Sequence, residues 1–221
     1  MMIKHYLKVA FRNLAKYKVQ SIVSILGLAV GFVCFALSTL WIRYEMTYDT
    51  FHEGAERIYL VRAHYAHEPG KISNSTPYPL ADYLQKGNPE IEAMASTSVQ
   101  KVKFRVKDTE KDVVSAAADS VLMNFFNIRV LRGTVNFVKG TNGEIAITEE
   151  FSKRIFGEEE ALGREVEVSG HASKVGAIVS GWSSHSNIPY SILTSARHYT
   201  QWGSANENLF VRIRKGTNGE E

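Results

Sequence analysis

Residues 21–42 read SIVSILGLAVGFVCFALSTLWI and contain no charged side chain. A helix of this length rises roughly 33 Å at about 1.5 Å per residue, and the hydrocarbon core of a bilayer is about 30 Å thick. The serine and threonine hydroxyls in the run can bond back to helix carbonyls. The run therefore predicts a transmembrane helix, to which we assign residues 21–43.

The charges on either side of this run predict its orientation. Residues 1–20 carry five Lys or Arg side chains and no acid, whereas Arg43 is opposed by Glu45 and Asp49. Cytoplasmic flanks of membrane helices are enriched in Lys and Arg. We therefore expect the amino terminus in the cytoplasm and the rest of the chain across the membrane.

A cleaved secretory signal is the competing interpretation of the same run, because Ala36-Leu37-Ser38 could serve as a cleavage triplet. The apolar region of such a signal has about 7–15 residues, and this run is longer. We favour a retained anchor. The single cysteine, Cys34, lies inside the run and cannot form an intrachain disulfide.

The residues before the run show a second pattern. Apolar side chains recur at three- and four-residue steps between Ile3 and Tyr17, and cations occupy an adjoining sector of the helical wheel. This predicts a basic amphipathic helix on an anionic membrane surface within residues 1–20; a flexible basic arm is the alternative. The cations that we expect at the membrane surface are Lys4, Lys8, Arg12 and Lys16.

Gly27 and Gly31 stand four residues apart within the run. Small residues at this spacing let two membrane helices approach closely. We therefore expect both glycines to be helix-contact residues, although such pairs also occur by chance in membrane helices.

The rest of the chain differs in charge from this arm. From residue 44 onward it has 20 Lys and Arg against 23 Asp and Glu, a net charge of −3, while the whole chain carries +3. No basic stripe interleaved with aromatic side chains occurs there, which argues against a nucleic-acid partner. The hydrophobic content of 44% is typical of folded protein.

Strand and helix patterns alternate through this region and predict an α+β fold with an antiparallel or mixed sheet. Residues 101–107 alternate in polarity and turn back into 113–114, which predicts a hairpin. Asp119 and Thr148 are predicted helix N-caps. We expect a helix ending at Lys86, a second ending at Gly157, and strands at 58–63, 145–147, 166–168, 175–179 and 209–213.

No catalytic, cofactor or metal site is predicted. The sequence lacks a glycine-rich loop with the lysine of a nucleotide site, so any ATP is bound by another chain. His64 and His67 would point to opposite faces of a strand. Residues 183–186 (SSHS) lack the surroundings of a nucleophile elbow and are interpreted as a solvated loop. We expect no enzyme.

A longer pattern begins after the run, where YDTFH (48–52) leads into RIYLV (57–61). Together with KVAFRNLAKYK (8–18) and ILGLAVGF (25–32), it closely resembles the start of ABC transporter permeases of the MacB/FtsX type, in the variety common in Bacteroidetes-like bacteria. The resemblance covers essentially the whole chain, and its later parts are TPYPLA (76–81), NPEIE (88–92), ADS (118–120), FF (125–126), AITE (146–149), IFG (155–157) and LG (162–163).

The resemblance implies a transmembrane helix in the cell inner (plasma) membrane, followed by a MacB-like periplasmic core domain at 48–221. In such domains a porter-like α/β part carries an inserted, mostly β lobe. Here the porter-like part would comprise 50–110 and 206–221, and the lobe 115–205. Later parts of the family would follow Glu221, so we expect an incomplete portion of a longer permease.

The resemblance also implies partners. Family members act with a separate cytoplasmic ATP-binding subunit and typically as dimers, so we expect that subunit and a homodimer or a related permease. ATP-driven movement of the helices would move the periplasmic domain, for export or mechanotransmission. A periplasmic adaptor and a peptide or lipoprotein cargo are further candidates, and the sequence does not identify the cargo. The alternatives are a single-span, membrane-anchored periplasmic binding or adaptor domain and a membrane-anchored enzyme.

Five residues match the family motif just outside the membrane, and we expect them to fix how the outer domain sits on the first helix. A pairing of Arg57 with Asp49 is one possible arrangement, and ordinary packing and capping is the other interpretation. The five residues are Asp49, Phe51, His52, Arg57 and Tyr59.

Overall fold

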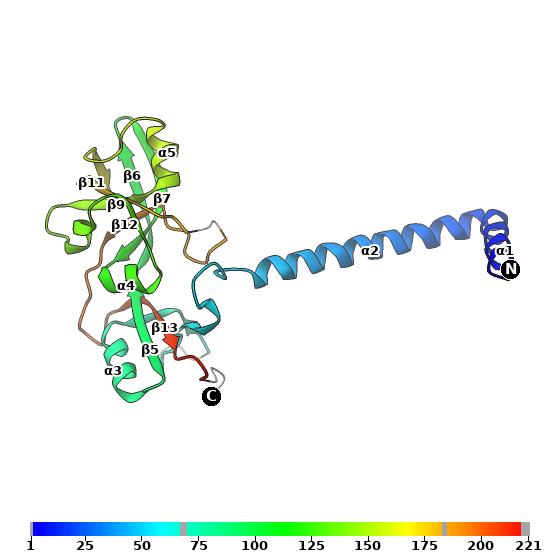
Figure 1. Ribbon diagram of the computed structural model, residues 1–221, viewed down its shortest axis with the longest axis horizontal. Coiled ribbons are helices and arrows are strands. Elements are labelled where there is room, and N and C mark those ends of the chain that lie inside the picture. Colours follow the sequence, from blue (N-terminus) through cyan, green and yellow to red (C-terminus); the bar gives the residue numbers. More distant parts are fainter. Residues whose placement is uncertain (1, 67–69, 183–184, 218–221) are drawn as a thin grey trace. The chain divides into compact units, whose positions relative to one another are not determined.

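The computed structural model describes residues 2–66, 70–182 and 185–217 (Figure 1), without the side chains of residues 2–4, 7, 10 and 11. The chain forms two compact units, residues 1–48 and 49–221. Each unit is described by itself.

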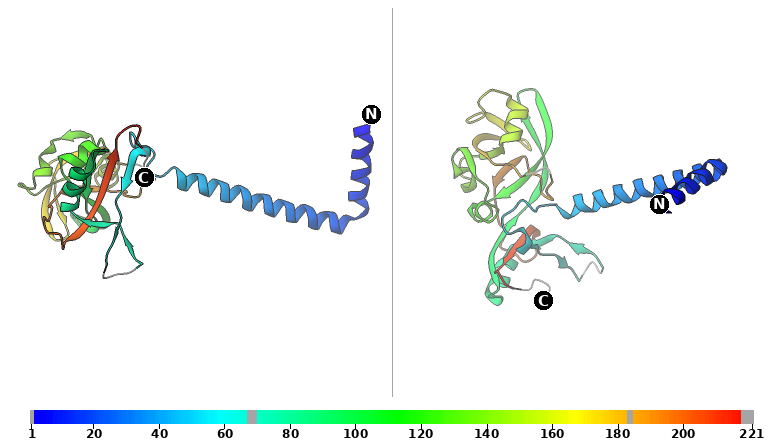
Figure 2. Two further views of the ribbon diagram at one scale, coloured as in Figure 1. Left: turned by 90° about the horizontal axis from the view of Figure 1, so that it is seen from below. Right: turned by 45° about the vertical axis from the view of Figure 1, so that its right-hand side comes forward.

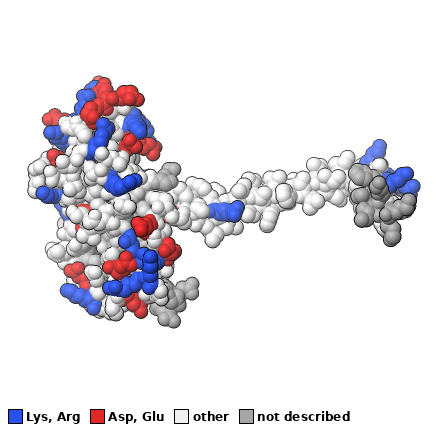
Figure 3. Space-filling model, viewed as in Figure 1, with Lys and Arg blue, Asp and Glu red and all other residues white. Residues whose placement is uncertain are grey.

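The first unit consists of two helices, α1 (Met2–Lys16) and α2 (Lys18–Met46). They are separated at Tyr17, whose φ of −108° and ψ of 59° lie outside the helical region. By length and composition, α2 is the one described helix able to cross a membrane, and none of its side chains is buried. Figure 3 shows that its middle is free of charged side chains. The helix contains the predicted span of 21–43 and extends beyond both of its ends.

The second unit contains a sheet of four antiparallel strands built around β13 (Ala205–Ile213). One edge of β13 pairs with β5 (Ile91–Thr97). The other edge pairs end to end with β1 (Ile58–Leu60) and β4 (Ser75–Pro77). We call this the four-stranded sheet; it lies at the end of the unit opposite α5 (Figure 1). A short helical turn, η1, precedes β1, and a small hairpin follows it: their bounds are Ala55–Arg57 for η1, Ala63–His64 for β2 and Ile72–Ser73 for β3.

Helices cover both faces of the four-stranded sheet. On one face α3 (Pro79–Gly87) packs the partly buried Leu80 and Leu84 against Leu209 and neighbouring apolar side chains. On the other face α4 (Ser120–Phe125) contacts β5. Successive side chains of a strand point to opposite faces, so β13 supplies apolar contacts to both helices.

The other large sheet closes on itself, because β10 pairs with both β6 and β11. Closure leaves its six ring strands without a free edge. The sheet is mixed, as predicted, since the β12–β7 and β11–β9 pairs are parallel. We call it the barrel; β8 (Val130–Gly133) pairs with the remaining part of β11. The ring order is β10 (Glu165–Val168), β6 (Val99–Val106), β7 (Thr109–Ala118), β12 (Ile192–Ser195), β9 (Glu144–Thr148) and β11 (His171–Val179).

The barrel interior is a continuous apolar core. Phe104 and Phe151 are each 1% exposed and meet edge to face with ring centroids 5.0 Å apart. Ile147 and Ile192 are fully buried in the same cluster. Phe151 belongs to α5 (Glu149–Phe156), which follows β9, and the short helix η2 (Val135–Lys139) contacts three strands of the barrel.

The local predictions of turns and caps are confirmed. The predicted hairpin is formed by β6 and β7 (Figure 2), and Val102 lies opposite Val113. The Asp119 carboxylate accepts a hydrogen bond from Leu122 N at 2.7 Å, and Thr148 Oγ1 accepts one from Phe151 N at 3.2 Å. Gly157 ends α5 with φ +61°, a value that favours glycine.

The chain passes directly from the four-stranded sheet to the barrel at Ser98, between β5 and β6. Residues 196–204 make the return from β12 to β13. The resemblance places the boundary between the porter-like part and the inserted lobe at residues 110–115. In the structure β6 and β7 both belong to the barrel, so the chain enters the barrel before that boundary. The division of the core domain into a porter-like part and an inserted lobe stays a prediction.

Candidate functional site: the segment that follows the apolar helix

Asp49, the first residue of the second unit, makes four hydrogen bonds to residues 185–187. Its carboxylate accepts bonds from Ser186 Oγ at 2.5 Å, Asn187 Nδ2 at 2.8 Å and Asn187 N at 3.2 Å. Its own N–H donates to the carbonyl of His185 at 3.3 Å. Asp49 has φ +56°, a left-handed conformation that aspartate adopts more readily than most residues. The bonds hold this residue in a conformation that the chain alone would disfavour.

His52 packs among aromatic rings. Its centroid lies 4.2 Å from that of Phe51, 4.7 Å from Trp182 and 4.8 Å from Phe126. Burial lowers the pKa of His52 more than the nearby Asp49 carboxylate raises it. The imidazole is therefore neutral at pH 7 and acts as a flat packing surface.

The rings around His52 belong to a larger aromatic cluster. Phe126 lies 4.8 Å from Trp182 and 5.1 Å from Phe210, and Trp182 lies 5.0 Å from Tyr190, as ring centroids. Phe210 belongs to β13 of the four-stranded sheet, while Tyr190 precedes β12 of the barrel. His52 thus rests on a cluster that both sheets share.

Arg57 fastens the segment at a third point. Its Nη1 donates to Glu92 Oε2 at 2.5 Å and to the carbonyl of Ile213 at 2.8 Å, at the ends of β5 and β13. The hydrogen bond from Arg57 lowers the pKa of Glu92. The predicted pairing of Arg57 with Asp49 is wrong, because each side chain bonds to a different partner. Tyr59 lies in β1 opposite Val211, with its side chain 43% exposed.

These contacts define the exit anchor, which consists of Asp49, Phe51, His52 and Arg57. The chain directly after α2 is held by polar bonds, by ring packing and by an ion pair within nine residues. The start of the second unit is thus fixed at three points. Sequence reasoning missed the anchor's partners, which are Trp182, Ser186, Asn187 and Glu92.

Ser186 corrects the interpretation of residues 183–186 as a solvated loop. It is 5% exposed, and its hydroxyl both donates to Asp49 and accepts from Ile188 N. Ser183 and Ser184 lie outside the described residues. A signal for this contact was available, because a serine beside an asparagine offers the donors that a carboxylate needs.

The other predicted residues lie on the first unit. Gly27 and Gly31 are exposed on α2, and a Cβ at either position would meet nothing within 4 Å. Lys8, Arg12 and Lys16 are exposed on α1, whereas the side chain of Lys4 is outside the described part. Their roles in helix contact and at the membrane surface stay predictions.

His64 and His67, which were not expected to form a metal site, cannot be compared in the structure. His64 is exposed in β2, and His67 lies among residues that the structure does not describe. Across residues 2–66, 70–182 and 185–217, no group of three or more His, Cys, Asp or Glu side chains is arranged to hold a metal ion.

The chain thus combines a helix that is long and apolar enough to cross a membrane with a domain made of a barrel and a four-stranded sheet. Residues 21–221 match the model of the MacB-like periplasmic core domain, and the chain belongs to this family. The predicted fold class and the resemblance to MacB/FtsX-type permeases are confirmed. This is a family of transporter permease domains and not of typical enzymes, and its membership in ABC transporters implies an ATP-binding partner.

Solved structures share the fold. A permease-protein domain from Porphyromonas gingivalis aligns with a TM-score of 0.64 and 19% identity, over 76% of this chain and 80% of that one. The extracellular domain of the ABC-type transporter YknZ from Gram-positive bacteria aligns with a TM-score of 0.54 and 16% identity, over 71% of this chain and 83% of that one. The periplasmic region of MacB from Actinobacillus actinomycetemcomitans aligns with a TM-score of 0.52 and 12% identity, over 74% of this chain and 77% of that one. The search of curated proteins finds no match.

Proposed function

We propose that this chain is a portion of the permease subunit of a MacB/FtsX-type ABC transporter, and that it couples ATP hydrolysis by a cytoplasmic partner chain to movement of the periplasmic domain. The exit anchor is the observation that carries the proposal. A flexible linker would let the helix move without moving the domain, whereas this helix is followed at once by residues that are bonded into the domain.

The link between helix and domain is short. Only Thr47 and Tyr48 separate the last residue of α2 from Asp49. A fully extended chain spans about 3.3–3.6 Å per residue, so the three steps from Met46 to Asp49 provide at most roughly 11 Å of slack. Larger displacements of the helix end must be passed on to the domain or must break the anchor.

The proposal includes an arrangement in the membrane. The amino terminus lies in the cytoplasm and the domain in the periplasm, with Lys8, Arg12 and Lys16 at the inner leaflet of the cell inner membrane. Gly27 and Gly31 contact a second permease helix, in a homodimer or with a related subunit. Export and mechanotransmission both agree with this arrangement, and the cargo stays open.

The test uses the full-length permease with its ATP-binding subunit, reconstituted in membranes. Asp49→Gly removes the carboxylate and keeps the left-handed backbone, because glycine adopts a positive φ without strain. We expect ATP hydrolysis to continue while the nucleotide-dependent movement of the domain, followed by a fluorescent label pair, is largely lost. Asp108→Gly, in the exposed turn between β6 and β7, is the matched control.

Two results would overturn the proposal. One is a domain that moves with nucleotide as fully in Asp49→Gly as in the parent protein. The other is the failure of any ATP-binding subunit to copurify with the full-length protein, while the domain still captures an envelope protein. That second result would favour the membrane-anchored binding or adaptor domain.

A further inference from the structure

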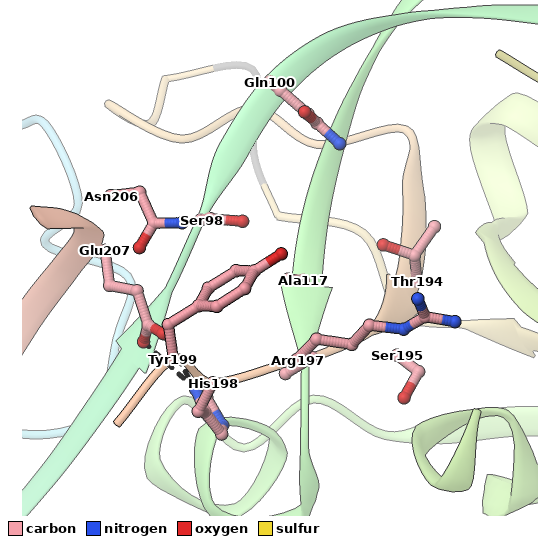
Figure 4. Close-up of a pocket in the computed structure, with 11 residues that line it drawn as sticks. Ser98, Gln100, Ala117, Thr194, Ser195, Arg197, His198, Tyr199, Asn206 and Glu207 are labelled. Atoms are coloured by element: carbon pink, nitrogen blue, oxygen red, sulfur yellow. Dashed lines mark hydrogen bonds and ion pairs between the residues drawn. The ribbon is translucent and has the colours of Figure 1, made fainter. Parts of the chain in front are cut away.

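A polar cleft lies at the junction between the barrel and the four-stranded sheet. Figure 4 shows Gln100 and Thr194 on the barrel side and Asn206 at the start of β13, with Tyr199 between them. These residues surround the two places where the chain crosses from one sheet to the other, at Ser98 and at residues 196–204. The cleft therefore lies between the two sheets, at the points where the chain passes from one to the other.

His198 bridges this junction with both of its ring nitrogens. Nε2 lies 3.2 Å from Oδ2 of Asp119, the residue that directly follows β7 of the barrel and caps α4. Nδ1 lies 3.0 Å from Glu207 Oε1 and 3.1 Å from Oε2, on β13. A carboxylate accepts hydrogen bonds, so each nitrogen must carry a proton and the ring is an imidazolium. The same contacts raise the pKa of His198 to about 9, through the hydrogen bonds with Asp119 and Glu207.

The surroundings keep the bridge in place. Glu207 is 3% exposed, and its Oε2 also accepts a hydrogen bond from Ser96 Oγ at 2.5 Å. The ring of Tyr78 stacks on His198 with centroids 4.0 Å apart and planes 12° from parallel. A buried carboxylate without a cation is strongly destabilising. The imidazolium is thus the partner that Glu207 requires.

We infer that His198 is a charged clasp between the barrel and the four-stranded sheet, which holds the two sheets at one angle and makes the domain move as a single body. A neutral imidazole has one N–H, so on losing its proton it would turn a lone pair toward one of the two carboxylates. One link would then be replaced by repulsion. The inference concerns the domain alone and stands whether or not the proposed coupling exists.

The charged and titratable groups that face His198 come from three elements. They are Asp119 directly after β7, Glu207 on β13, and Tyr78, which directly precedes α3. Desolvation raises the pKa of Tyr78, and the carboxylates of Asp119, Asp82 and Glu207 raise it further. Among the described residues, His198 is the cation that forms an ion pair with Asp119 and with Glu207.

The clasp can be tested by measuring the distance between the two sheets in the whole chain in detergent. Spin labels are placed at Lys86→Cys on α3 and Lys111→Cys on β7, both exposed positions, in a Cys34→Ser background. The parent protein should give one narrow distance distribution at pH 7. In His198→Gln we expect the distribution to widen about twofold, because glutamine carries no charge for Glu207. His171→Gln, at an exposed histidine of β11, is the control.

Raising the pH provides an independent arm. At about pH 10, above the pKa of His198, the parent distribution should widen as in the variant, while His198→Gln should show no further change. Asp119→Asn keeps an acceptor for the α4 cap and removes only the charge, so it should widen the distribution as well. Unchanged widths in His198→Gln and Asp119→Asn would refute the clasp.

If His198→Gln does not fold, as judged by far-UV circular dichroism, Asp119→Asn and the parent protein at alkaline pH decide the matter. A parent distribution that stays narrow at about pH 10 would then refute the clasp. The distance measurement does not involve nucleotide. The clasp can therefore be refuted while the proposed function holds, and the proposed function can be refuted while the clasp holds.

Discussion

The barrel and the four-stranded sheet are held together by different interactions. The barrel is a closed ring of strands around fully buried side chains such as Phe104, Ile147 and Ile192. The four-stranded sheet has a smaller apolar core, with Met94, Leu209 and Val211 as its buried members. Its other face shares an apolar cluster with the barrel, in which Phe210 packs on Phe126, and the His198 bridge adds charged hydrogen bonds at the junction.

The difference shows which part is suited to respond to its surroundings. Apolar burial is non-directional and is lost only when the core opens. Charged hydrogen bonds depend on geometry and on protonation, so they can be broken singly. The charged bonds of His198 and Asp49 can therefore be broken one at a time, whereas the apolar clusters are lost only when the core opens.

The largest effect on stability is expected from the barrel core. Phe104→Ala removes a ring that packs edge to face on Phe151, and truncations of this kind cost about 3–5 kcal/mol. Chemical denaturation of the chain in detergent measures the change. Lys103→Ala, on the same strand but facing solvent, is the control. If Phe104→Ala lowered the unfolding free energy as little as Lys103→Ala does, the apolar core would not be what stabilises the barrel.

Removal of the clasp should have the next largest effect on the unfolding free energy, and this effect should depend on pH. At pH 7, His198→Gln is expected to lose about 1–3 kcal/mol, because Glu207 keeps its charge without a cation. The folded-state pKa of about 9 lies above the ordinary value of 6.5. The folded state therefore binds the proton more tightly, and the stabilisation is complete below pH 6.5 and lost as the pH rises through about 9.

A titration of stability separates this effect from general alkaline unfolding. The difference in unfolding free energy between the parent and His198→Gln should shrink steadily from pH 6.5 to above 9. A difference that stays constant over this range would show that the packing of the ring, and not its charge, stabilises the junction. The hydrogen bonds of Asp119 outweigh its desolvation and lower its pKa in the folded state. The stability of the folded parent protein should therefore also decrease at low pH, where Asp119 loses its negative charge.

Local features of the domain could be predicted from the sequence, because their information lies within a few residues. The N-caps at Asp119 and Thr148 and the β6–β7 hairpin depend on short-range spacing. An antiparallel or mixed sheet was predicted and the barrel sheet is mixed, but its closure into a barrel was not predicted. Closure depends on β10 pairing with β6, and no pattern within either strand encodes that register.

The sequence pointed to residues of the exit anchor but not to the residues that they contact. The motif identified Asp49, His52 and Arg57, but it could not supply their partners, since Ser186 lies 137 residues after Asp49. Closeness in sequence led to the incorrect pairing of Arg57 with Asp49. His198 carried no signal at all, because a single histidine in a loop acquires its role only when the fold brings two carboxylates to it.

The exit anchor should matter less for stability than for coupling. Asp49→Gly removes three hydrogen bonds at the domain surface, and each contributes about 1 kcal/mol or less where water can replace it. We expect a small decrease in unfolding free energy together with a raised rate of amide exchange at residues 185–188. Unchanged exchange there would show that the carboxylate does not hold this segment.

The smallest effect is expected from charges on the outside of the barrel, where both signs are gathered around α5 and the neighbouring strands (Figure 3). Glu110 accepts hydrogen bonds from Lys103 at 2.7 Å and Arg105 at 2.8 Å, a geometry as close as that of Glu207 with His198. Glu110 is exposed, however, and exposed ion pairs are screened by water and salt.

The same substitution at the two sites therefore gives the sharpest comparison between barrel and sheet. Glu207→Gln should lower the denaturation midpoint clearly and widen the inter-sheet distance, whereas Glu110→Gln should leave both unchanged within error. The two variants have equal volume and equal loss of charge, so only burial and the role of the junction distinguish them. Equal effects at both positions would show that hydrogen-bond geometry alone, and not the junction between the sheets, determines what these carboxylates contribute.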